Sequence, residues 1–160
     1  IQRARAGDHA ALRHVTEWKN VGGRNGEIYP VAFHEHPQKE ASFQFFLGGL
    51  PGYLEPGGQH QFRAAFANRT KVWGKFWHHV LFGSPLFDRH TLRARRHELL
   101  GQIPPLEDVP LQGHWAIYDD YCLWFGQKLA HLQQNNAQVS ERILDRALMM
   151  WSMHNGELPL

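Results

Sequence analysis

The most regular pattern along the chain is a line of mainly aromatic positions within residues 59–82. Its members recur at intervals of four or three residues, and they are Phe62, Phe66, Arg69, Trp73, Phe76 and Val80. This spacing is that of one face of an α-helix. Gly83 suits a left-handed C-terminal residue, and Pro85 cannot continue a helix. We therefore predict one helix from Gln59 to Phe82.

Five further stretches combine helical spacing with residues that start or stop helices. They run from Asp8 to Lys19, Gln38 to Leu47, Asp88 to Leu100, Ile117 to Leu132 and Val139 to His154. Asp8 and Asp88 are suitable N-caps, whereas Gly101 and Asn135 are suitable stops. The expected apolar face of the first stretch is Ala11, Leu12, Val15 and Trp18. That of the last is Val139, Ile143, Ala147, Met150 and His154, with Leu144, Leu148 and Trp151 beside it.

Glycine and proline divide the N-terminal third of the chain. Residues from Gly22 to Pro37 predict a surface-following arm that is extended from Ile28 to His34, and those from Gly48 to Gly58 predict a loop without regular structure. We expect an N-terminal helix with extended arms in residues 1–58 and a helical domain in residues 59–160. The predicted fold class is all-α, an irregular bundle of about four or five helices with an extended Gly/Pro-rich N-terminal arm.

Composition excludes several classes of protein. The chain has 160 residues, 42% of them hydrophobic, which suffices for a packed core, but no window is apolar enough for a membrane span. The formal net charge of +2 gives no strong attraction to nucleic acid, and one cysteine, Cys122, excludes a disulfide framework. The first seven residues carry two arginines and no acid, as the remnant behind a removed organellar transit peptide would; the competing interpretation is that the sequence simply begins at this point.

The residues that could carry chemistry do not form a recognisable catalytic pattern. His34 and His36 would share one side of an extended arm and could supply two metal ligands; an exposed polar turn is the competing interpretation. Of the adjacent His78 and His79, one should face the core. Cys122 lies among acids and aromatic residues, so a buried inert thiol is expected. Asp119 and Asp120 should cap or form ion pairs near a helix start, and no serine lies in a nucleophile elbow. We therefore predict no catalytic, cofactor-binding or metal-binding residues.

Two surfaces could bind a macromolecule. A basic helix face, with aromatic residues nearby for base stacking, could bind RNA; it comprises Arg89, Arg93, Arg95, Arg96, His90, His97, Trp73 and Trp77. Aromatic and apolar residues also occur on several helix faces, namely Val72, Trp77, Phe82, Trp115, Tyr118, Trp124, Met149 and Trp151. Such a surplus is typical of subunit interfaces, although a large core would also use it. We expect these faces and the Gly/Pro-rich arms to contact other protein subunits.

The stretch from Val72 to Arg142 resembles the PDSW-type accessory subunit of mitochondrial respiratory complex I. The shared order is an aromatic helix, a basic run from Asp88 to His97, a Pro104-Pro105 loop, the sequence Asp119-Asp120-Tyr121-Cys122, and a helix reaching Glu141-Arg142. That family carries several cysteines where this chain has only Cys122. The composition, which is rich in His and Trp and interrupted by Gly and Pro without a recognisable site, is also similar to that of lineage-specific subunits of mitochondrial ATP synthase or of a mitochondrial ribosome.

This resemblance implies a non-catalytic structural accessory subunit of a respiratory or ATP synthase complex, peripheral to the mitochondrial inner membrane. We expect its partners to be other protein subunits of a large complex. The alternatives are an RNA-binding subunit of a mitochondrial ribosome, or a small metalloenzyme with His34 and His36 as ligands.

Overall fold

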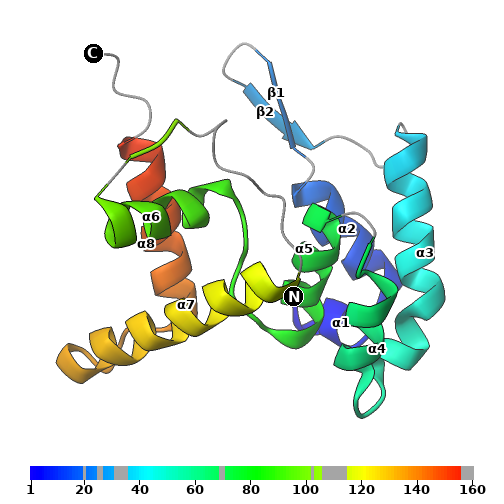
Figure 1. The fold of residues 1–160 in the computed structure, drawn as a ribbon. Coiled ribbons are helices and arrows are strands. Elements are labelled where there is room, and N and C mark those ends of the chain that lie inside the picture. The colour runs from blue at the N-terminus through cyan, green and yellow to red at the C-terminus, as the bar shows by residue number, and fades with distance from the viewer. Residues whose placement is uncertain are drawn as a thin grey trace. The chain divides into compact units, whose positions relative to one another are not determined.

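The computed structural model describes residues 1–19, 21–24, 27–30, 36–68, 71–101, 103–105 and 115–155. These residues form eight helices and one β-hairpin (Figure 1). In chain order they are α1 (Gln2–Arg5), α2 (His9–Lys19), β1 (Val21–Arg24), β2 (Glu27–Pro30), α3 (Pro37–Leu54), α4 (Gly58–Ala65), α5 (Lys71–Phe82), α6 (Arg89–Leu100), α7 (Trp115–Asn135) and α8 (Glu141–His154). The predicted helical class is confirmed, but the predicted count of four or five helices is wrong.

The chain divides into two compact units. The first comprises Ile1–Phe66 with Val80–Phe82, and the second comprises Ala67–His79 with Gly83–Leu160. The boundary expected between residues 58 and 59 lies inside the first unit.

Helix α2 begins where the sequence indicates. Asp8 Oδ1 accepts a hydrogen bond from the backbone N–H of Ala11 at 3.0 Å, so Asp8 is the predicted N-cap. The buried face differs from the prediction, because Leu12 and Thr16 are enclosed while Trp18 is 68% exposed. The Thr16 hydroxyl is satisfied within the helix, since it donates to the carbonyl of Leu12 at 2.8 Å.

The segment after α2 is partly a hairpin rather than an unpaired arm. Strands β1 and β2 are antiparallel, with Val21 opposite Pro30 and Arg24 opposite Glu27. Residues 31–35, which hold the rest of the predicted extended arm, lie outside the described residues.

Helix α3 corrects the prediction for residues 48–58. Pro37 occupies the first turn as expected, but the helix continues past Gly48 and through Pro51 to Leu54. Some of the glycines make room for packing. A Cβ on Gly49 would lie within 3 Å of the Tyr53 ring, and one on Gly58 would lie 2.2 Å from the Tyr53 carbonyl oxygen. We infer that glycine here allows α3 and α4, which pack on each other, to approach closely.

An aromatic cluster forms the core of the first unit. Tyr53 lies 5.0 Å from Phe62, edge to face, and Phe62 stacks on Phe66 at 4.5 Å between ring centroids. Phe43 and Phe46 complete it from α3. The predicted single helix from Gln59 to Phe82 is wrong, because α4 ends at Ala65 and α5 begins at Lys71. Of the predicted line of aromatic positions, Arg69 lies outside the described residues.

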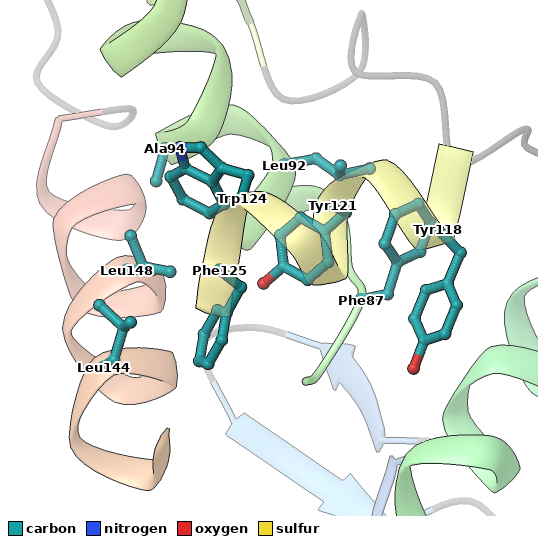
Figure 2. Close-up of a cluster of buried hydrophobic side chains, with 9 residues drawn as sticks. All are labelled: Phe87, Leu92, Ala94, Tyr118, Tyr121, Trp124, Phe125, Leu144 and Leu148. Atoms are coloured by element: carbon teal, nitrogen blue, oxygen red, sulfur yellow. The ribbon is translucent and has the colours of Figure 1, made fainter. Parts of the chain in front are cut away.

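The second unit is held together by α6, α7 and α8. Asp88 and Thr91 form a reciprocal cap at the start of α6, with N···O distances of 3.0 and 3.2 Å. Gly101 ends α6 with φ +65°, as predicted. Figure 2 shows the core, in which rings projecting from α7 meet Leu144 and Leu148 of α8. Its buried members are Phe87, Leu92, Ala94, Tyr118, Tyr121, Trp124, Phe125, Leu144 and Leu148.

Candidate interaction surface and buried polar groups

The first buried polar group joins α5 to the loop that follows it. His78 is fully enclosed, and its Nδ1 lies 2.7 Å from Ser84 Oγ and 3.3 Å from Tyr118 Oη. His79 is half-buried, and its Nδ1 lies 2.5 Å from the Ser84 carbonyl oxygen. Because a carbonyl oxygen can only accept, Nδ1 of His79 carries the proton. The prediction that one of the two histidines faces the core is confirmed.

Lys75 lies one turn before His78 and is only 3% exposed. Its Nζ is 5.3 Å from the centroid of the Phe87 ring and 5.6 Å from that of Trp115, which are cation–π distances. The sequence analysis missed Lys75, because a single lysine within an aromatic run gives no signal of burial. Lys75 and the hydrogen-bonded pair His78 and Ser84 therefore lie where α5 meets the ring of Trp115.

A second buried polar group surrounds Asp145 of α8. Its Oδ2 is 3.5 Å from the backbone nitrogen of Leu86, while its Oδ1 has no hydrogen-bond partner among the described residues. Burial raises the pKa of Asp145 to about 7, and the charges of Asp88 and Glu141 add to this effect, which the Leu86 N–H opposes. The Tyr121 hydroxyl is also buried; burial raises the pKa of Tyr121, and the nearby Thr91 side chain opposes this effect although the two do not reach full hydrogen-bond geometry. The sequence analysis missed both residues.

The basic residues of α6 do not share one exposed face. His90, Arg93 and His97 lie against α8, beside which α6 runs in Figure 1. His90 Nδ1 is 3.1 Å from Ser152 Oγ, and Arg93 donates to the carbonyl of Ser152 at 3.2 Å, close to the C-terminus of α8. The predicted basic surface is therefore wrong for Arg93, which is buried.

The other members of the predicted RNA surface also differ in exposure. Arg89 and Arg96 are exposed, and Arg95 is half-buried. Trp77 is fully buried and Trp73 half-buried, so neither presents an open ring face of the kind that base stacking requires.

The remaining candidates are dispersed. Cys122 is half-buried against the core of the second unit rather than fully buried. Asp119 and Asp120 are exposed on α7. His36 is exposed, and His34 lies outside the described residues. Among the residues described, no three His, Cys, Asp or Glu side chains are grouped so that they could hold a metal ion.

Helix α8 presents apolar residues on two sides. Leu144 and Leu148 face the core, whereas Ile143 is 53% exposed and Met150 is 39% exposed. With Ala147, which is also exposed, Ile143 and Met150 follow the i, i+4, i+7 spacing of one helix face. We call these three residues the outer face of α8. These residues belong to the line that the sequence predicts for one face of the last helix. Leu99, Leu100 and Ile103, at the end of α6 and just beyond it, are exposed as well.

Comparison with known proteins returned no match to a protein-family model, a curated protein or a solved structure. Within the described part of the chain, no helix combines the length and apolar character needed to cross a membrane.

Proposed function

We propose that this chain is a non-catalytic structural subunit of a larger protein assembly. The observation that carries the proposal is the outer face of α8, where Ile143 and Met150 remain exposed although the opposite side of the same helix is packed into a core. Burying both side chains against a neighbour would contribute about 1.5–3 kcal/mol for each fully buried side chain. Exposed apolar residues in line on a helix are typical of a surface that binds another protein.

For the assembly we propose a respiratory or ATP synthase complex of the mitochondrial inner membrane, to which this chain binds peripherally through its protein neighbours. The support is the resemblance of residues 72–142 to a PDSW-type complex I subunit. A catalytic function is less well supported, because Lys75 and His78 are buried among core side chains and Asp145 is half-buried beside Leu86.

The test is the size of the native particle. The chain should be isolated from its own source under mild conditions and followed by native electrophoresis and size-exclusion chromatography with an antibody. We expect it in a particle far larger than its own 18.5 kDa, co-fractionating with respiratory or ATP synthase activity. Migration as a monodisperse monomer would contradict the subunit proposal. Co-fractionation with a different assembly would contradict the mitochondrial assignment alone.

A further inference from the structure

The outer face of α8 has a defined length and shape. Ile143 and Met150 are seven residues apart, which is about two helical turns or roughly 10.5 Å. Ala147 lies between them, and its small side chain would let a second helix approach closely. Methionine is flexible and adapts to the surface that it contacts. These features fit the side of a helix better than a flat sheet or a single inserted side chain.

The charges beside this face have one sign. Arg142 and Arg146 are exposed along one border of the outer face. The two acids of α8, Glu141 and Asp145, project from the side of the helix that carries Leu144 and Leu148, at about 100° per residue. Asp145 is further neutralised near pH 7, because its pKa is raised to about 7. A partner would therefore meet apolar side chains bordered by positive charge.

This arrangement disfavours a second copy of the same chain. If two α8 helices crossed at Ala147, the two copies of Arg146 would lie near the crossing point, where like charges repel. A membrane surface is a poorer fit, because a helix lying in the interface usually presents Trp, Phe or Leu, whereas the exposed large apolar residues of α8 are Ile143, Met150 and Met153. RNA would use the arginines but leave Ile143 and Met150 without a role.

We propose that the outer face of α8 binds an amphipathic helix of a partner protein, whose apolar side packs on Ile143, Ala147 and Met150 and whose acidic side chains pair with Arg142 and Arg146. This proposal rests on the subunit function proposed above and names the partner's chemistry. The exposed ion pairs would set orientation and specificity, while the apolar contact would supply most of the affinity.

Site-specific photo-crosslinking in the assembled particle tests the proposal. The full chain is produced in its own source with Met150→p-benzoylphenylalanine, and a matched control carries the same residue at Leu123, which is 64% exposed on α7. Circular dichroism and thermal unfolding check that both variants fold. We expect position 150 to crosslink to a protein segment with i, i+4, i+7 apolar spacing and at least two acidic residues, and position 123 not to reach that segment.

Charge reversal adds a second readout. The double variant Arg142→Glu with Arg146→Glu should lower the yield of that crosslink about tenfold or more, whereas Arg89→Glu on α6 should leave it unchanged. The proposal is overturned if position 150 crosslinks to RNA, to lipid, to a second copy or to a segment without acids, or if no crosslink forms in an intact particle. If the unmodified chain is found in no particle at all, the subunit function itself fails, so the two failures are distinguishable.

Discussion

Replacing the half-buried carboxyl of Asp145 tests whether this group lowers the free energy of unfolding of the second unit in a pH-dependent way. The pKa of Asp145 is about 7 in the folded chain, against 3.8 for an ordinary aspartate. Below about pH 3 the group is protonated in both the folded and unfolded states and does not lower the stability. As the pH rises towards 7, the unfolded chain releases a proton that the folded chain retains. Stability therefore falls over this range, and the penalty is complete above about pH 7.

The size of the penalty follows from the two pKa values. One pKa unit corresponds to about 1.4 kcal/mol, so the rise from 3.8 to about 7 gives an upper value of ~4 kcal/mol. Asp145 is only half-buried, and solvent screening reduces that value. We expect Asp145→Asn to raise the free energy of unfolding by about 1–2 kcal/mol at pH 8 and to leave it nearly unchanged at pH 4, since an amide keeps the acceptor for Leu86 N–H.

Urea unfolding monitored by tryptophan fluorescence, repeated from pH 4 to pH 8, measures the effect. Asp120→Asn is the matched control, because Asp120 is an exposed acid on the neighbouring helix α7. Its effect should remain within a few tenths of a kcal/mol across the same range. An equal stability change for Asp145→Asn at pH 4 and pH 8 would refute the reasoning, as would a carboxyl carbon of Asp145 that titrates below pH 5 by NMR.

Three further outcomes follow from the packing. Gly58→Ala should destabilise the chain by about 2 kcal/mol, because the new Cβ would lie 2.2 Å from the Tyr53 carbonyl oxygen. Gly48→Ala should stabilise the chain by roughly 0.5–1 kcal/mol, because a Cβ there would meet nothing within 4 Å. Thermal unfolding compares the two variants, and equal melting temperatures would contradict the close approach at Gly58. Tyr121→Phe removes a buried hydroxyl that lies beside the Thr91 side chain without full hydrogen-bond geometry, so the melting temperature should stay nearly unchanged, and a loss above about 1 kcal/mol would show that Tyr121 and Thr91 are hydrogen-bonded. Ser140→Ala should lower the free energy of unfolding in urea by about 1 kcal/mol, because Ser140 Oγ accepts a hydrogen bond from the backbone N–H of Ile143 at 3.3 Å. Ser140→Asp should keep this N-cap, so equal losses of stability in both variants would argue against capping.

Helix ends were predictable wherever a single residue determines them. Asp8 and Asp88 cap through their own side chains, and Gly101 adopts the left-handed conformation that glycine favours. These interactions are local, so the sequence contains all of the information they need. The sequence did not indicate the second half of the cap of α6, in which the Thr91 hydroxyl accepts a hydrogen bond from the backbone N–H of Asp88.

The errors in the helix boundaries arose where side-chain packing, rather than the propensity of single residues, decides the outcome. Glycine and proline predict a loop for residues 48–58, but Pro51 is tolerated inside α3, and Gly58 is small because the chain around Tyr53 approaches it. Propensity alone cannot separate a glycine that breaks a helix from one that permits close packing. The split between α4 and α5 has a similar origin, since Phe66 ends its helix while stacked on Phe62.

The residues of the candidate sites, like the helix ends, were predictable only where local sequence determines them. Spacing identified the basic residues of α6, but it could not show that Arg93 lies against the last carbonyls of α8, which removes it from the surface. Nothing in the sequence around Asp145 indicates burial, because its neighbours Leu144 and Arg146 alternate in character. Its raised pKa depends mainly on the enclosure that α8 acquires only after packing, and to a smaller extent on Asp88, which lies 57 positions earlier in the chain.

The two sides of helix α8 relate the packing of the chain to its proposed function. Its sequence holds two apolar lines, one through Leu144 and Leu148 and one through Ile143 and Met150, and periodicity gives no reason to choose between them. The structure packs the first line into the core and leaves the second exposed. Charged residues at positions 143 and 150 would keep an unpartnered helix more soluble, so the exposed Ile143 and Met150 support the proposed contact with a partner. If a partner packs on this helix as proposed, its surface should be both apolar and acidic, because Arg142 and Arg146 border the exposed line.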